Sequence, residues 1–322
     1  MTNKKQLDFK LGDSVKKLLP LIMLLVIGAI ISAIQPAFAT WTNLTNIMMN
    51  YAGTAFVALG AMMVIITGGI DFTSAEVYSC GSVIGGILYL RSGGQPILLL
   101  LGCLMVGIGV GVVNGLLIAH LKFPSFIATL AMQSLVHGLM LFFAEGQIIQ
   151  LEGPVIEFLG KGRLLGIPVA FVMLILFGIV LWFVMNRTRF GTYTYALGGN
   201  ADALAYTGVN LKKYTVLVYA AAGLCSALGT ILITCRMSAI YSSTSSTLLV
   251  DGIASTVIGG TATSGGKGTV FGTIAGAMII GTIGASMTIL SVPVKMQNVV
   301  KGLIIIAALL VDVLINRRNA RA

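Results

Sequence analysis

Two stretches of sequence decide the fold, LLLLGCLMV at Leu98–Val106 and FVMLILFGIVL at Phe171–Leu181. Neither shows the alternation of polar and apolar residues that a strand of a membrane β-barrel requires. A bilayer core about 30 Å thick is crossed by a helix of about 20 mostly apolar residues. The two runs therefore predict an all-α protein, a bundle of membrane-spanning helices.

The composition of the 322 residues agrees with this fold class. Hydrophobic residues make up 57% of the chain and charged residues 9%, with a mean hydropathy of +0.99. Soluble proteins carry about 25% charged residues, so a soluble globular domain is excluded. The net charge of +10 comes from basic residues between the apolar runs, where membrane topology explains them and no nucleic-acid partner is needed. The four cysteines lack paired spacing and are predicted to be small packing residues.

The apolar runs divide the chain into about ten predicted spans. Two of these, 74–90 and 249–262, are weakly apolar, so a count between eight and eleven is compatible with the sequence. The predicted spans are 18–34, 47–67, 74–90, 96–118, 125–143, 165–186, 214–234, 249–262, 268–288 and 296–315.

The distribution of basic residues predicts the orientation. In the ten-span reading, fourteen of the 20 lysines and arginines lie on one side, which the positive-inside rule assigns to the cytoplasm. The single transmembrane domain, 1–322, then has three cytoplasmic parts: the N-terminus 1–17, the loop 187–213 and the tail 316–322. The exceptions are Arg91, Lys161, Arg163, Arg236 and Lys295 outside, and Lys301 within the last span.

Two further features leave alternatives open. The segment 144–164 is too polar to span, and it is either a structured extracytoplasmic docking loop or a solvated connector. Glycines recur at every fourth position, which predicts close helix packing within one bundle or at a subunit interface. These glycines are Gly81, Gly85, Gly107, Gly111, Gly115, Gly268, Gly272 and Gly276.

The segment TGGIDFTSAE at Thr67–Glu76 interrupts an apolar stretch. Irregular backbone at membrane depth needs protein or water to satisfy it, and carboxylates there are functional candidates. Three interpretations remain: Asp71 caps a helix that begins near Thr73, the segment lines a pathway or gate, or its carboxylates couple ions.

A second interruption runs from Asp251 to Gly268 and contains Gly-Gly-Lys-Gly. This sequence lacks the spacing and the Ser or Thr of a phosphate-binding loop, so any ATPase is expected on another chain. His120 and His137 have no partner at ligand spacing and are predicted to be loop or bundle residues. No metal box, cofactor fingerprint or catalytic group is found, so we expect neither an enzyme nor a bound cofactor.

The loop at 187–214 is a polar, basic island in an apolar chain. Residues 201–206 are predicted to form a short helix with Asn200 as N-cap and Gly208 as terminator. Such a helix is either a rigid projection that a soluble partner binds or a connector held by anionic lipid headgroups.

Five ordered blocks resemble one known family over nearly the whole chain. They are TGGID at 67–71, NGLLI at 114–118 with FPSFIATL at 123–130, TYALGGN at 194–200, DALAYTG at 202–208 and DGIASTVIGG at 251–260. With these blocks the chain resembles the permease subunit of ribose-type sugar ABC importers.

The resemblance implies a multi-pass protein of the bacterial inner membrane, surrounded by lipid, that carries a sugar-like solute. It also implies partners: a second permease subunit, identical or a sister chain, two cytoplasmic ATPases that bind the ATP, and an extracytoplasmic solute-binding protein. The implied coupling residues are Gly198, Asn200, Asp202, Ala203, Leu204 and Gly208. The candidates for pathway or gate are Thr67, Asp71, Thr73, Glu76, Asn114, Thr129 and Asp251.

The chain departs from the family pattern at a few positions. Phe72 replaces Leu, Ala75-Glu76 replaces Val-Gly, His137 replaces Arg and Leu204 replaces the second Ala of the coupling block. The alternative from another functional class is a secondary transporter that couples a small polar solute to ions through Asp71, Glu76 or Asp251.

Overall fold

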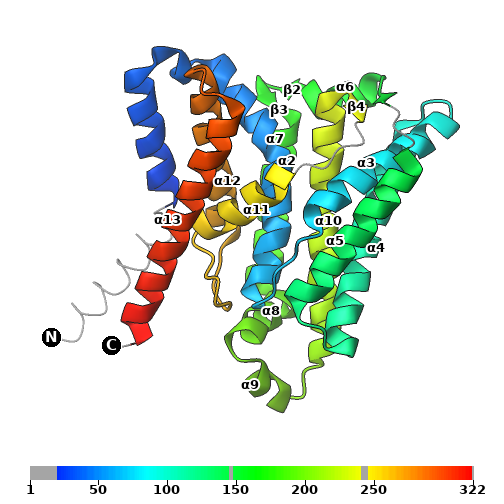
Figure 1. Cartoon of the computed structure of the whole chain (residues 1–322), viewed down its shortest axis with the longest axis vertical. Helices are drawn as coiled ribbons and strands as arrows, with labels where there is room; N and C mark the ends of the chain where they lie inside the picture. The colour runs from blue at the N-terminus through cyan, green and yellow to red at the C-terminus, as the bar shows by residue number, and fades with distance from the viewer. Residues whose placement is uncertain (1–19, 145–147, 241–245, 321–322) are drawn as a thin grey trace.

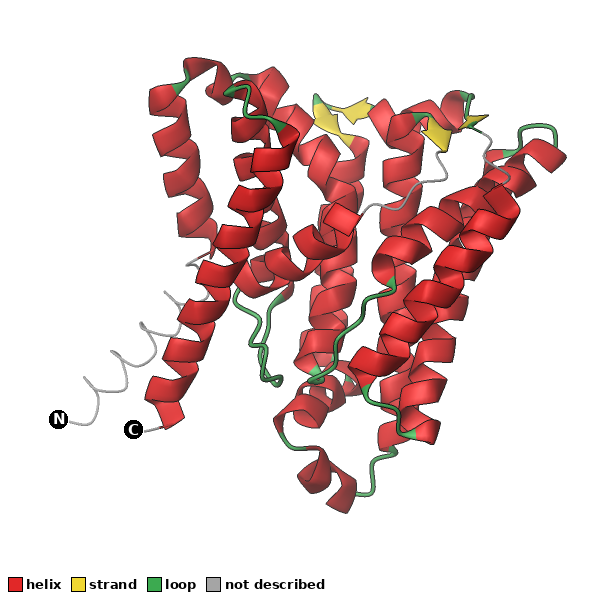
Figure 2. Cartoon of the chain, viewed as in Figure 1, coloured by secondary structure: helices red, strands yellow, loops and turns green. Residues whose placement is uncertain are grey.

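The computed structural model describes residues 20–144, 148–240 and 246–320, and nearly all regular structure in these ranges is helical (Figure 2). The longer helices are Pro20–Ile34, α2 (Trp41–Ile66), α3 (Ser74–Arg91), α4 (Pro96–Leu121), α5 (Ser125–Ala144), α7 (Val169–Arg187), α10 (Leu211–Met237), α11 (Ser246–Ile258), α12 (Val270–Ile289) and α13 (Val294–Ala320). The shorter elements are η1 (Pro36–Ala39), α6 (Pro154–Lys161), α8 (Arg189–Gly199), α9 (Ala201–Tyr206), and the strands β1 (Ile149–Gln150), β2 (Arg163–Leu164), β3 (Ile167–Pro168) and β4 (Ala239–Ile240).

The predicted fold class, an all-α bundle, is confirmed, whereas the count of ten crossings stays a prediction. Within the described ranges, six helices are long and apolar enough to cross a membrane: α2, α4, α5, α7, α10 and α12. Each remaining predicted span also coincides with a helix. One of these, α11, has 13 residues and reaches only about 20 Å at 1.5 Å per residue.

Two buried apolar clusters fill the bundle, and α10 contributes to both. One cluster joins α10 to α2, α7 and α12, and the other joins it to α3, α4, α5 and α6. Figure 1 shows α2 and α10 side by side in the interior, with α11 running obliquely in front of α2. The cysteines pack in this interior, as predicted, since all four are buried and free: Cys80, Cys103, Cys225 and Cys235.

Small residues let α4 approach α10 closely. A Cβ added at Gly107, Gly111 or Gly115 would meet backbone atoms of α10 at less than 3 Å. Gly85 likewise faces the backbone of α4, and Gly276 that of α11. At these positions packing within the bundle, one of the two interpretations of the glycine pattern, is confirmed. Gly268 differs because it lies in the loop before α12.

The segment that follows α5 forms a cap over one end of the bundle. β1 pairs antiparallel with β4, and α6 contacts α10, where a Cβ at Gly160 would overlap the backbone of Cys235. The Tyr89 hydroxyl donates to the Glu152 carbonyl oxygen at 2.8 Å. The described part of this segment is therefore structured, not a loose connector; residues 145–147 lie outside the described residues.

Candidate functional site

The short helix α9 forms where the sequence predicts it. Asn200 has an extended backbone, and its Oδ1 accepts from the Ala203 backbone N–H at 2.9 Å, which makes it the N-cap. Gly208 has a φ of +78°, a left-handed conformation that glycine adopts without steric penalty. The helix, its cap and its terminator are confirmed. The preceding helix α8 was not predicted.

α9 presents most of its surface outward. Leu204 is its one buried residue, 7% exposed, and α9 contacts α8 and α10. Asp202 and Ala203 are exposed, and Tyr206 is 91% exposed. The helix is therefore held by one apolar side chain while its polar and aromatic groups remain accessible.

The end of α8 meets both interruptions of the bundle. Gly266, from the glycine-rich loop, donates its backbone N–H to the Ile66 carbonyl oxygen of α2 at 2.8 Å. Gly198 fits against the same carbonyl, because a Cβ there would overlap the Ile66 oxygen and lie 2.8 Å from the Gly266 nitrogen. The Tyr195 hydroxyl of α8 donates to the Gly268 carbonyl oxygen at 2.9 Å. Burial raises the pKa of Tyr195 above its ordinary value.

The first interruption is an ordered loop between α2 and α3. Gly68, with a φ of +80°, ends α2, and the Thr67 hydroxyl donates to the Val64 carbonyl oxygen at 2.7 Å. The Oδ1 of Asp71 accepts from the backbone N–H of Thr73 at 2.8 Å and from its hydroxyl at 2.6 Å. The capping interpretation is wrong, because the N-cap of α3 is Thr73 and no side chain caps this helix; Asp71 instead holds the turn that precedes α3.

Side chains from α4 and α5 complete this network. The Asn114 amide donates to the Thr73 hydroxyl at 3.1 Å, and the Thr129 hydroxyl donates to the Ile70 carbonyl oxygen at 3.1 Å. The structure thus brings together four of the seven pathway candidates, Asp71, Thr73, Asn114 and Thr129, all buried. Buried polar groups with partners fix a conformation, so the network holds the loop in place.

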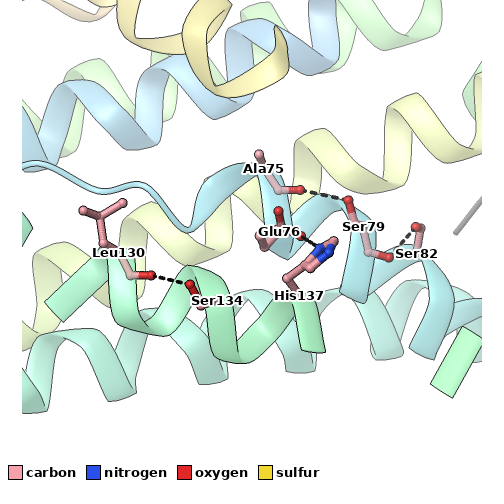
Figure 3. Close-up of polar contacts among 7 residues, drawn as sticks. All are labelled: Ala75, Glu76, Ser79, Ser82, Leu130, Ser134 and His137. Atoms are coloured by element: carbon pink, nitrogen blue, oxygen red, sulfur yellow. Dashed lines mark hydrogen bonds and ion pairs between the residues drawn. The ribbon is translucent and has the colours of Figure 1, made fainter. Parts of the chain in front are cut away.

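Glu76 and His137 form a second polar contact, in the first turn of α3. They point toward each other across α3 and α5 (Figure 3), with Glu76 Oε2 3.2 Å from His137 Nδ1. The Glu76 side chain is 3% exposed and that of His137 38%. Both residues depart from the family pattern, and here they touch. Residue spacing could not reveal this pair, because Glu76 and His137 are 61 residues apart in the sequence. The only signal in the sequence was that both residues differ from the family pattern.

This contact is testable by a double-mutant cycle. We expect His137→Leu to lower the free energy of unfolding by about 1–3 kcal/mol, because it takes a partner from a buried carboxylate. The double variant Glu76→Gln/His137→Leu should lose less than the sum of the single variants. Thermal unfolding in detergent measures this, and additive losses would show that the two side chains do not interact.

Asp251 lies apart from the Asp71 network. Its Oδ2 accepts from Lys301 Nζ of α13 at 2.8 Å, and the two side chains are 9% and 12% exposed. The sequence predicts Lys301 within the last span, and the structure gives it Asp251 as a partner. The seventh candidate therefore belongs to a different polar site, at the contact of α11 and α13.

Comparison with known proteins gives a consistent result. Residues 43–309 match the family described as branched-chain amino acid transport system / permease component. The chain is 36% identical to the ribose import permease protein of Bacillus subtilis over 314 residues, 97% of this chain and 96% of the relative. It is 31% identical to the D-allose transport system permease protein of Escherichia coli over 298 residues, 92% and 91% of the two chains.

A third relative is the L-arabinose ABC transporter permease protein of Azospirillum brasilense, 30% identical over 300 residues, 93% of this chain and 88% of the relative. No solved structure matches the chain. The family match covers more than half of the sequence, and the relatives align over nearly their whole length. The chain therefore belongs to the branched-chain amino acid transport system / permease component family and is a multi-span membrane permease of a bacterial ABC importer.

Proposed function

We propose that this permease forms the membrane pathway for a sugar that an extracytoplasmic binding protein delivers, and that cytoplasmic ATPases drive transport through α9. The observation that carries the proposal is the geometry of α8 and α9: an exposed, capped helix joined to the ends of both interruptions of the bundle. The relatives are permeases for ribose, D-allose and L-arabinose, which favours a monosaccharide as the solute.

Motion would pass from the ATPase to the bundle by direct contact. α9 is anchored by Leu204, and α8 touches the Ile66 carbonyl through Gly198 and the Gly268 carbonyl through Tyr195. A displacement of α9 therefore acts on the start of the first loop and on the end of the second. Transitions of this kind proceed by movement of packed rigid elements. As a permease component the chain is not itself an enzyme and carries no cofactor, so the ATP belongs to the partner subunits.

The proposed topology has ten membrane segments and both termini in the cytoplasm. In Figure 1 the start of the Pro20–Ile34 helix and the end of α13 point toward the end of the bundle that carries α8 and α9. We assign that end, with the coupling loop 187–213, to the cytoplasm. The cap of α6 and its strands then faces outward, where it is the proposed docking surface for the binding protein.

Transport by proteoliposomes tests the energy source. Uptake of sugar should require the ATPase subunits and ATP, and a proton or sodium gradient alone should drive none. In the ion-coupled alternative Asp71, Glu76 or Asp251 would exchange ions during transport, although each already has a protein partner. Uptake driven by an ion gradient in vesicles without the ATPase would establish that alternative.

Two substitutions, one in α9 and one just after its end, test the coupling residues. We expect Gly208→Val to reduce ATP-driven uptake strongly, because a β-branched residue in the left-handed conformation costs about 1–2 kcal/mol and displaces the end of the helix. Asp202→Lys should weaken ATPase binding through an exposed charge reversal. Co-purification of the ATPase and uptake measure both effects, with membrane insertion unchanged. Gly208→Asn is the matched control, since asparagine tolerates this conformation; equal losses in both Gly208 variants would refute the conformational explanation.

A further inference from the structure

A polar pocket of about 330 Å³ lies within the bundle, between α2, α3, α10, α11 and α13. Charged and hydrogen-bonding side chains dominate its lining: Asn50, Tyr51, Tyr78, Arg236, Asp251 and Lys301. Three other cavities of the described structure are lined mainly by apolar side chains, apart from Arg91 in one and Asn186, Tyr195 and Thr269 in another. Charged groups among membrane helices commonly mark a solute pathway.

Asp251 leaves one acceptor unused in this pocket. Its Oδ2 is occupied by Lys301, whereas its Oδ1 is buried and has no hydrogen-bond partner among the described residues. A buried carboxylate oxygen without a donor is unfavourable. A hydroxyl group that enters the pocket would satisfy it with a charge-assisted hydrogen bond.

Arg236 supplies donors to the same space. It is half-buried at the end of α10, and no described carboxylate lies within ion-pair distance of its guanidinium. Tyr51 and Tyr78 add hydroxyls, which both donate and accept, and aromatic rings with apolar faces. Donors, acceptors and aromatic faces together match a sugar, whose hydroxyls need both kinds of partner and whose C–H groups are apolar.

We propose that this pocket is a binding site for the transported solute within the membrane and that it holds one neutral monosaccharide. The inference rests on the proposed function and adds the location and the chemical class of the ligand. The volume lies at the small end of the usual range for small-molecule sites, about 300–1,000 Å³, so it holds one sugar ring and not an oligosaccharide. Arg236 and Lys301 repel a cation. The free Asp251 oxygen needs a hydrogen-bond donor, which a sugar hydroxyl supplies, and the competition with D-gluconate described below tests for an anion.

The test uses the complete importer in proteoliposomes, with its ATPase and binding protein, and labelled D-ribose, D-allose and L-arabinose as probes. For the sugar that is transported, we expect Asp251→Asn to lower uptake about ten-fold or more, the effect of losing a hydrogen bond to a charged group. ATP hydrolysis should stay within about two-fold, since α9 is untouched. Tyr78→Phe removes one hydroxyl and keeps the ring, so it should change the ratio of uptake among the three sugars.

Two further variants separate ligand binding from a structural role of the ion pair. Asp251→Asn/Lys301→Gln removes both charges; if the pair only joins α11 to α13, uptake should recover, which would overturn the inference. Under the proposal uptake stays low. Lys295→Gln, an exposed lysine on the same helix, is the control and should leave uptake unchanged.

Three other outcomes would contradict either the binding site or the proposed function. Normal uptake of all three sugars by Asp251→Asn would overturn the site while leaving the proposed function intact. Competition by D-gluconate stronger than by any of the three sugars would overturn the assignment of a neutral ligand. Failure of the unmodified importer to take up any of the sugars would reject the proposed function itself, before any variant is compared.

Discussion

Gly198→Ala is expected to abolish ATP-driven uptake. The added methyl group would overlap the Ile66 carbonyl oxygen and lie 2.8 Å from the Gly266 nitrogen. These are backbone atoms of two other segments, so no side chain can rotate away. The overlap is relieved only if α8 moves away from the end of α2. This movement also strains the hydrogen bond of 2.8 Å between the Gly266 N–H and the Ile66 carbonyl oxygen. Overpacking of this kind costs about 1–3 kcal/mol. Here it separates α8, which carries α9, from both loops.

The neighbouring glycine provides the control. A Cβ at Gly199 meets nothing within 4 Å, and the residue ends the same helix. Gly199→Ala should therefore retain uptake close to that of the unmodified permease. Uptake, ATP hydrolysis and membrane content are measured for both variants in the complete importer. If Gly198→Ala transports as well as Gly199→Ala, α8 does not transmit motion through this contact.

Gly111→Ala is expected to destabilise the whole helical bundle. Its Cβ would overlap the Tyr219 carbonyl oxygen and lie 3.1 Å from the Ala220 Cα. Because α4 packs along α10, and α10 contributes to both apolar clusters, the displacement would affect the whole bundle. We expect the free energy of unfolding to fall by about 1–3 kcal/mol or more.

Gly109 on the same helix is the matched control. It is exposed, and a Cβ there meets nothing within 4 Å. Alanine in a helix is favoured over glycine by about 0.5–1 kcal/mol, so Gly109→Ala should unfold at the same temperature or slightly higher. Thermal unfolding of purified permease in detergent compares the two variants. Equal midpoints would mean that α4 and α10 are not in close contact at Gly111.

The features that could be predicted from the sequence are those set by residues close to one another in the chain. Long apolar runs determine the helices, and Asn200 and Gly208 determine α9 by cap and terminator chemistry that acts over a few residues. The interruptions predicted at 67–76 and 251–268 were recognised because their glycines and polar residues break an apolar pattern. Their bounds were too wide, since α3 begins at Ser74 and α11 extends to Ile258. Each of these signals can be recognised without knowing the tertiary arrangement.

The contacts between distant segments could not be predicted in this way. The Glu76–His137 and Asp251–Lys301 pairs span 61 and 50 residues, and their partners are set by which helices pack together. Arg236 was assigned to an outer loop, whereas the structure places it in a polar pocket. The Gly265–Gly268 loop failed as a phosphate-binding motif, and its role against α8 and α2 follows only from the tertiary structure.

The hydrogen bond from Gly266 to the last carbonyl of α2 has a consequence for the tightness of the membrane. It joins the two interruptions to each other. If these loops form a gate in the proposed pathway, neither would open alone without breaking this bond. A half-opened conduit, in which one loop has moved and the other has not, is therefore disfavoured. Such an arrangement would let an importer admit sugars without dissipating the proton gradient. A variant in which this hydrogen bond is weakened should therefore first show passive leakage of protons across the membrane.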